Sequence, residues 1–277
     1  MSTLDTLVAA TEADPAWRGR DAFLARAEAM DALELHMVPS RDAALRGRAE
    51  ALVAAMEALD RTLFDHLRER IRQGDGRAAL APWLGEPATP GQHYDAVDAL
   101  LAGVLAIGEP DAPAGALPPD MVFYQPTPAR HIVDGIRRAG IAERDVVLDL
   151  GSGLGHVPML VHLLTGARAR GVEREAAYVD SARRAAVSLG LEGVRLEEGD
   201  ARHADLAGVD VFYLFTPFLG PILRAVVDRI QAEALSRPLR VVTLGPCTRT
   251  FARMPWLRSD AADPSATDRI VVFHASR

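Results

Sequence analysis

The residue pattern with the clearest chemical meaning is a glycine-rich segment, DLGSGLGHVP, at residues 149–158. Gly151 and Gly153 leave the backbone free to pass close to a bound ligand, and Gly155 opens the helix expected to follow. Pro158 falls in the first turn of that helix, where its missing N–H costs nothing. A tight strand-to-helix turn without a ligand uses glycine in the same way, so other residues must decide between the two interpretations.

Three carboxylates stand at fixed positions around this segment. Asp149 precedes the glycines, which suits a cationic group better than a pyrophosphate. Glu173 lies roughly twenty residues farther on, at the end of an expected strand, where a carboxylate can accept hydrogen bonds from both ribose hydroxyls. Asp200 follows the next expected strand and, with the Ala201 amide, suits an adenine edge. Single carboxylates are common at strand ends, but these three in this order favour a nucleoside ligand.

Alternating strands and helices must position these residues. From about residue 126 short apolar runs alternate with amphipathic stretches, which is typical of parallel βαβ units. The pattern predicts an open, doubly wound α/β sheet with its ligand beyond the carboxyl ends of the strands. The expected helices span residues 127–138, 154–164, 175–189 and 221–235, and the expected strands are VVLDL, ARGVE, VRLEE, VDVFYLF, LRVVTL and RIVVFHAS.

The part of the chain before about residue 108 shows helical periodicity alone. One long helix is expected after Ser40, a suitable N-cap, and it should end at the glycines of residues 74–76. A shorter helix and a third apolar stripe at residues 94–105 follow. The proline- and glycine-rich stretch at residues 109–119 predicts a linker. The expected domains are therefore an all-helical one at residues 1–118 and an α/β one at residues 119–277.

Residues 146–200 resemble the nucleotide-binding half of a class I, seven-strand methyltransferase that uses S-adenosylmethionine, and the resemblance extends over about residues 124–277. In that family the DxGxGxG loop approaches the methionine part of the cofactor, the next acid holds the ribose and the third contacts the adenine. The resemblance also implies a mostly parallel sheet whose last strand, RIVVFHAS, runs antiparallel. The cofactor-binding residues that it implies are Asp149, Gly151, Ser152, Gly153, Gly155, Glu173, Asp200 and Ala201.

The glycine spacing argues against a nicotinamide enzyme. The third glycine comes one residue too early for GxGxxG, and His156 stands where a small residue is expected. Within the methyltransferases, the order DLGSGLGHV, TGAR, GVE is similar to that of the non-SET histone lysine methyltransferases related to disruptor of telomeric silencing. That family carries an asparagine pair before a phenylalanine at the fourth strand, whereas this chain has FYLFTPF at residues 212–218. The same stretch lacks the asparagine of the NPPF motif of methyltransferases that act on amino groups of bases.

Two segments are expected on the side of the methyl acceptor. The stretch VFYQPTPARH at residues 122–131 resembles the FYTP stretch that closes over the cofactor in some adenine methyltransferases. Tyr124 and Thr127 would then bond the methionine carboxylate; alternatively, the prolines only begin a helix and Tyr124 packs on the linker. At the fourth strand, Phe215 would stabilise the sulfonium by about 0.5–2 kcal/mol. The hydroxyls of Tyr124 and Thr216 are the predicted catalytic groups, orienting the acceptor or receiving a proton through water.

Composition removes several function classes. The net charge of −7 comes from 31 basic and 38 acidic residues without a block of like charges, which argues against nucleic-acid binding. Cys247 is the single cysteine, so the sequence predicts no disulfide and a reducing compartment. The N-terminus does not resemble a secretory signal, and no apolar run approaches the roughly 20 residues of a membrane span. We therefore expect a cytoplasmic protein without a membrane partner.

The eight histidines do not form a ligand set with metal spacing, so no metal is expected. The leading hypothesis is a methyltransferase that converts S-adenosylmethionine to S-adenosylhomocysteine while methylating a small molecule or a protein, with the helical domain covering the acceptor. The alternatives are a non-SET protein lysine methyltransferase and a non-catalytic cofactor-binding interaction protein. Aminopropyl transfer would need extra acids near the fourth strand, and FYLFTPF supplies none. The oligomeric state is left open.

Overall fold

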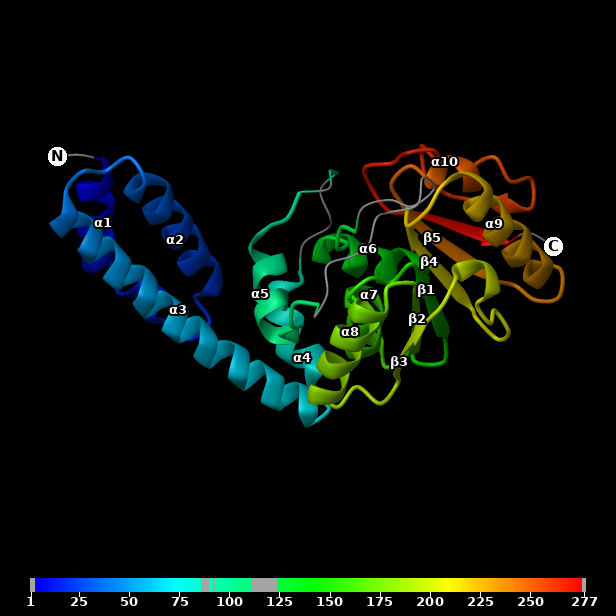
Figure 1. Ribbon diagram of the computed structural model, residues 1–277, viewed down its shortest axis with the longest axis horizontal. Coiled ribbons are helices and arrows are strands. Elements are labelled where there is room, and N and C mark those ends of the chain that lie inside the picture. Colours follow the sequence, from blue (N-terminus) through cyan, green and yellow to red (C-terminus); the bar gives the residue numbers. More distant parts are fainter. Residues whose placement is uncertain (1–2, 86–89, 92, 111–123, 276–277) are drawn as a thin grey trace.

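A seven-stranded, mostly parallel sheet forms the centre of the protein. The computed structural model describes residues 3–85, 90–91, 93–110 and 124–275 (Figure 1). The strand order is β3-β2-β1-β4-β5-β7-β6, with β7 antiparallel to both neighbours and the other pairs parallel. This confirms the expected α/β sheet and its antiparallel last strand. The strands are β1 (Val146–Leu150), β2 (Arg168–Glu173), β3 (Val194–Glu198), β4 (Val211–Phe215), β5 (Arg240–Leu244), β6 (Leu257–Arg258) and β7 (Val271–Ala275).

The order of the strands reverses between β1 and β4. The chain proceeds outward from β1 to β3 and then returns to place β4 on the other side of β1. The carboxyl ends of β1 and β4 therefore diverge into separate connections, which is where open α/β sheets bind ligands. Asp149 and Tyr213 are paired neighbours in register at this point. The strand β6, which is only two residues long, had no apolar run by which the sequence could reveal it.

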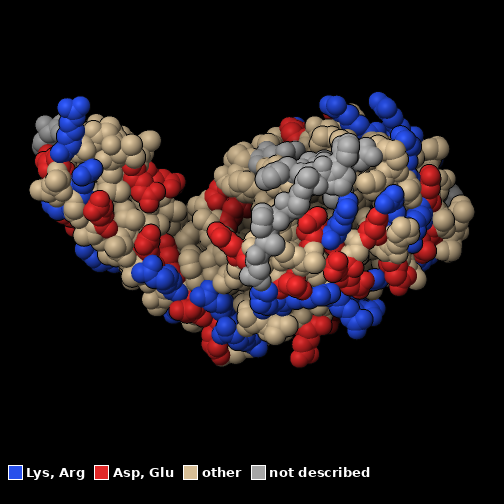
Figure 2. Space-filling model, viewed as in Figure 1, with Lys and Arg blue, Asp and Glu red and all other residues tan. Residues whose placement is uncertain are grey.

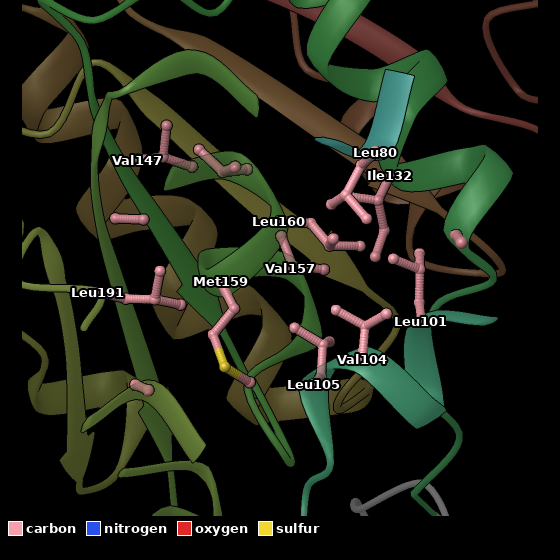
Figure 3. Close-up of a cluster of buried hydrophobic side chains, with 14 of the residues drawn as sticks. Leu80, Leu101, Val104, Leu105, Ile132, Val147, Val157, Met159, Leu160 and Leu191 are labelled. Carbon is pink, nitrogen blue, oxygen red and sulfur yellow. The ribbon is translucent and has the colours of Figure 1, made fainter. Parts of the chain in front are cut away.

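Helices cover both faces of the sheet (Figure 1). One face carries α6 (Ala129–Ala139), α7 (His156–Thr165) and α8 (Ala176–Ser188), and the other carries α9 (Gly220–Ala234) and the short α10 (Thr248–Phe251). The four expected helices are confirmed as α6 to α9, with ends shifted by one or two residues. Figure 3 shows the hydrophobic core between the sheet and the helices α6 to α8. In it, Val147 of β1 lies in one cluster with Val157, Met159 and Leu160 of α7.

The N-terminal region is helical as expected. It contains α1 (Thr3–Ala13), α2 (Phe23–Met37), α3 (Ala43–Arg72), α4 (Gly76–Leu80) and α5 (Ala96–Leu105), with 3-10 turns at Ala16–Arg18 and Ala81–Trp83. The predicted N-cap of α3 was wrong. Asp42, not Ser40, accepts the hydrogen bond from the Leu45 amide at 3.0 Å, because only Asp42 directly precedes the first helical turn.

The helical region has two parts with separate cores. The side chains of α1, α2 and the first half of α3 form a small cluster of their own. In contrast, Leu80 of α4 and Leu101, Val104 and Leu105 of α5 share the core of the α6–α7 layer (Figure 3). The α1–α3 part therefore extends from the body as an arm, and Figure 2 shows a hollow between the two with acidic and basic side chains intermixed on this face.

A hydrogen bond joins α5 directly to α6. Pro128 leaves the start of α6 without a capping side chain, and Asp98 of α5 supplies one by accepting the Ala129 amide at 2.7 Å. The Tyr94 hydroxyl also donates to the Pro126 carbonyl at 2.9 Å. The expected boundary between residues 118 and 119 lies outside the described residues and stays a prediction. Among the described helices, none has the length and apolar character that a membrane span requires.

Candidate functional site

The glycine loop, residues 151–155, follows β1 and ends at the start of α7. The Gly151 and Ser152 amides both donate to the Val172 carbonyl at the end of β2, at 2.8 and 3.1 Å. The Gly155 amide donates to the Ser152 carbonyl at 2.8 Å. These bonds tie the loop to β2, so its backbone path is fixed before any ligand arrives.

Side chains from two other elements take the remaining loop amides. Gly153 N–H donates to the Glu173 carboxylate at 2.9 Å, and Leu154 N–H donates to the Tyr124 hydroxyl at 3.3 Å. Each of the five consecutive amides of the loop is thus bonded within the protein. A pyrophosphate site requires such amides to be free, since they bind the phosphate oxygens. The loop therefore does not have the donors of a dinucleotide site, which agrees with the prediction from the glycine spacing.

Two glycines in the loop allow close contacts that another residue would block. Gly151 has φ +85°, and a Cβ there would come within 2.1 Å of Pro217 from the β4 loop. Gly153 has φ +51°, and a Cβ there would lie 1.9 Å from the Tyr124 ring. Residues other than glycine are strained at such φ values as well as blocked. The glycines that the sequence singled out therefore bring the β4 loop and Tyr124 onto the end of β1.

Glu173 ends β2 and is buried with both carboxylate oxygens engaged. One oxygen accepts the Gly153 amide, and the other accepts the Arg174 and Glu175 amides at 2.7 and 3.0 Å. A carboxylate has about four acceptor positions, two on each oxygen, so the oxygen bonded to Gly153 can take one further donor. This group is rigidly placed at the edge of the loop, where the sequence predicts a ribose.

Asp149 is buried at the carboxyl end of β1. No hydrogen bond or ion pair engages its carboxylate within the part of the chain that the structure describes. Burial, and secondarily repulsion from Glu173, raises the pKa of Asp149 well above its ordinary value. A cationic group placed here would offset that cost by pairing with the ionised form. The geometry thus fits the predicted preference of Asp149 for a cation.

Tyr213 is the neighbour of Asp149 on β4, Thr127 lies near the Tyr213 hydroxyl, and both residues are buried. Burial raises the pKa of Tyr213, and the neighbouring Thr127 lowers it by a smaller amount. The Tyr213 hydroxyl nevertheless has no hydrogen bond of ordinary geometry to any described residue. An orphaned buried hydroxyl next to an unpaired carboxylate is costly unless a ligand or ordered water satisfies it. The strand ends therefore hold polar groups suited to a small polar ligand.

Tyr124 belongs to the segment before α6, and its ring lies against Gly153 of the glycine loop. Its ring packs at an angle on Tyr178 of α8, with the ring centroids 5.1 Å apart. Its hydroxyl lies 3.4 Å from His156 Nδ1, in addition to the bond from Leu154. Burial raises the pKa of Tyr124 and lowers that of His156 to about 4. Tyr178 was missed in the sequence, because its surface position on a helix carries no motif.

The predicted hydroxyl of Thr216 is used inside the protein. It donates to the Leu244 carbonyl at 2.9 Å and accepts the Cys247 amide at 3.0 Å, and the residue is buried. These two bonds hold a non-glycine residue at φ +38° where β4 ends. The catalytic role of this hydroxyl stays a prediction, and in the structure its hydrogen bonds to the Leu244 carbonyl. Thr216 positions the loop, while Phe215 beside it packs partly buried against the α6–α7 core.

Asp200 follows β3 and has a cationic partner. Arg202 pairs with both of its oxygens, at 2.5 Å for the shortest contact, and lowers the pKa of Asp200 to about 2. Asp200 also accepts the Arg202 amide at 2.8 Å and so caps the turn that begins at Ala201. The carboxylate is held ionised beside Ala201, the arrangement that the sequence predicts for an adenine edge.

Metal-binding clusters and pockets are two further features by which a site could be recognised. The described residues contain no group of three or more histidine, cysteine, aspartate or glutamate side chains able to hold a metal. A hollow of about 770 Å³ lies at the far end of the arm, between α1 and the α2–α3 connection. It contains none of the predicted site residues. The predicted residues Asp149, Glu173 and Phe215 lie instead at the carboxyl ends of β1, β2 and β4.

Comparison with known proteins gives only distant likenesses. No protein-family model and no curated protein matches the chain. An RNA methyltransferase from Salinibacter ruber, solved with S-adenosyl-L-homocysteine, is 27% identical over 55% of this chain and 92% of that one, with a TM-score of 0.44. The C-terminal domain of precorrin-6Y C5,15-methyltransferase from Rhodobacter capsulatus is 18% identical over 57% of this chain and 94% of that one, with a TM-score of 0.42.

A third solved structure, a SAM-dependent methyltransferase from Thiobacillus denitrificans, also contains S-adenosyl-L-homocysteine. It is 24% identical over 42% of this chain and 47% of that one, with a TM-score of 0.36. This chain therefore spans about half of that protein. Because all three TM-scores are below 0.5, these likenesses carry no conclusion about function.

Proposed function

We propose that the chain is an S-adenosylmethionine-dependent methyltransferase acting on a small molecule or a protein side chain. The observation that carries the proposal is the state of the glycine loop. All amides of residues 151–155 are bonded internally, while the Asp149 carboxylate beside them is buried and unpaired. Such a site rejects a phosphate and favours a cation, and S-adenosylmethionine carries an ammonium and a sulfonium but no phosphate.

The described residues fit the parts of this cofactor in the order of the strands. Asp149 would pair with the ammonium, with Thr127 toward the methionine carboxylate. Glu173 would accept the ribose hydroxyls at the end of β2. Asp200 and Ala201 would hold the adenine edge after β3, and Phe215 after β4 would face the sulfonium. Once bound, the cofactor supplies an activated methyl group.

Alignment is the main contribution expected from the protein. Holding two reactants in line is worth roughly 7–11 kcal/mol, so a rigid site suffices for much of the rate. The loop is bonded to β2 and the β4 loop is bonded to β5 through Thr216, and both are therefore fixed before binding. The acceptor would enter beside β4, since the acids after β1, β2 and β3 mark the cofactor half of the edge.

The helical region would form one wall of the acceptor site. Tyr94 and Asp98 of the α5 segment bond to Pro126 and Ala129, close to Tyr124 in the chain. These contacts support the expectation that residues 1–118 cover the acceptor side. The hollow between the arm and the body offers space for a larger acceptor such as a protein (Figure 2).

The ribose contact provides the direct test. Glu173→Ala removes one or two charge-assisted hydrogen bonds of about 1.5–3 kcal/mol each, so calorimetry should show S-adenosylhomocysteine binding weakened tenfold or more. Glu175→Ala is the matched control, because its side chain caps nothing although it lies two residues away. Equal affinity of the Glu173 variant and the parent would refute the assignment, as would competition by NAD at similar concentration. Cofactor binding without methyl transfer to any cell extract would favour the interaction protein instead.

A further inference from the structure

The Tyr124 hydroxyl is held from two sides by groups of different character. The Leu154 amide can only donate, so the phenol oxygen must accept there, at 3.3 Å. His156 Nδ1 lies 3.4 Å from the same oxygen. If Nδ1 carried the hydrogen, the partly buried phenol would have no described acceptor for its own O–H. If Nδ1 is unprotonated, it accepts the Tyr124 hydrogen, and both the hydroxyl and Nδ1 have a partner. The ring hydrogen of neutral His156 is then on Nε2.

The position of Tyr124 is fixed beyond these two bonds. Its ring lies directly over Gly153, with no room for a Cβ, and contacts the ring of Tyr178 on the other side. The hydroxyl therefore cannot rotate away without losing both contacts. With one lone pair bound to Leu154 and its hydrogen directed at His156, the oxygen keeps a second lone pair for a hydrogen on another molecule.

We propose that His156 positions the Tyr124 hydroxyl and that the pair receives the proton of a methyl acceptor that reacts through a hydroxyl group. The inference rests on the proposed function. The acceptor oxygen forms a bond to the methyl carbon while the carbon–sulfur bond breaks, its electron pair remaining on sulfur. The proton of the acceptor hydroxyl passes to the Tyr124 oxygen, and the hydrogen of Tyr124 passes to His156 Nδ1. The imidazolium then releases a proton to solvent.

The chemistry of the pair selects a hydroxyl over an amine. Burial lowers the pKa of His156 to about 4, so its imidazolium gives up a proton more readily than an ordinary one. Only a strongly acidic group can transfer a proton to it, and an oxygen that gains a methyl while still protonated is such a group. A methylated ammonium is a far weaker acid and would keep its proton. The titratable groups facing the pair are Asp149, Glu173, Tyr94 and Tyr178.

The hydrogen position can be tested without knowing the acceptor. Histidine-selective ¹⁵N spectra of the full chain with S-adenosylhomocysteine should show His156 as the neutral Nε2–H form. Its Nδ1 resonance should move in Tyr124→Phe, which keeps the ring and removes only the hydroxyl. His162 on the same helix is the control, since its Nδ1 lies 2.9 Å from the Ala167 carbonyl and should not respond. A hydrogen on Nδ1, or a His156 signal unaffected by Tyr124→Phe, would overturn the proposal.

The proton step needs a functional readout. His156→Asn keeps a polar group at this position but cannot take up a proton, so S-adenosylhomocysteine affinity should stay within about threefold of the parent. Transfer of a tritiated methyl group from S-adenosylmethionine to an extract of the source cell should fall about a hundredfold or more. The labelled products should be ethers or esters; N-methyl products, or a variant as active as the parent, would overturn the proposal. Failure of the parent to bind the cofactor would instead refute the proposed function.

Discussion

A methyl group added at Gly153 tests whether Tyr124 is held over the glycine loop. In Gly153→Ala the new Cβ would lie 1.9 Å from Cε2 of Tyr124, with two more ring atoms at 2.6 and 2.8 Å. Carbon atoms in contact are about 3.5 Å apart, so the ring must retreat by about 1.6 Å. The hydroxyl bonds to Leu154 and His156 are already 3.3 and 3.4 Å long and would break.

The cost of this movement can be separated from backbone strain. Alanine at the positive φ of Gly153 costs about 1–2 kcal/mol, and Gly190→Ala should incur the same strain at φ +69° with nothing within 4 Å of its Cβ. Overpacking adds about 1–3 kcal/mol at Gly153 alone. For a domain of this size that difference lowers Tm by about 2–12 °C relative to the control.

Thermal unfolding and calorimetry with S-adenosylhomocysteine measure the two consequences. We expect Gly190→Ala to keep the parent affinity and Gly153→Ala to lose at least tenfold, because the displaced ring enters the space assigned to the cofactor. Should the two variants share the same Tm and the same affinity, Tyr124 does not occupy the position described here, and the assignment of both residues to the cofactor site would be withdrawn.

Two further variants test the buried polar groups. The raised pKa of Asp149 means that folding favours its protonated form, so the contribution of this group to stability is most favourable below about pH 4 and is lost as pH rises through the raised pKa. Asp149→Asn should therefore raise Tm above the parent at neutral pH but not at pH 4, while abolishing cofactor binding; a Tm difference independent of pH would contradict this. Thr216→Val leaves the buried Cys247 amide and Leu244 carbonyl without their partner, and urea unfolding should show a loss of about 1–3 kcal/mol, whereas a change below 0.5 kcal/mol would refute the positioning role.

Periodicity explains why the α/β sheet could be predicted. The buried strands are continuous apolar runs, and the helices between them bury one face each, so both signals lie within single segments. The missed strand β6 has two residues and the misplaced N-cap differs by two positions, and in both cases the local pattern is too short to be decisive. The helices α5 and α6 share one core although they lie on opposite sides of the expected linker. Periodicity within each segment does not reveal a contact between the two.

The grouping of the glycine loop with its acids was more predictable than the surroundings of Tyr124 for a related reason. Asp149, Gly153 and Glu173 occur at fixed distances from strands that the sequence reveals, and the structure brings them together at one edge. Tyr178 contacts Tyr124 only because α8 packs against the same face of the sheet as α7. No spacing along the chain encodes that contact.

The sequence by itself determined the order of strands and helices, the position of the glycine loop and the residue types at the strand ends, since these depend on local pattern and backbone freedom. Only the tertiary structure decided how each polar group is used. In the folded chain the Thr216 hydroxyl donates to the backbone of β5, and Asp149 has no partner among the described residues. The Tyr124 hydroxyl lies within hydrogen-bond distance of His156. The physical reason is that hydrogen bonding and burial depend on atoms from distant segments, and a side chain's chemistry is settled by the partners that folding places beside it.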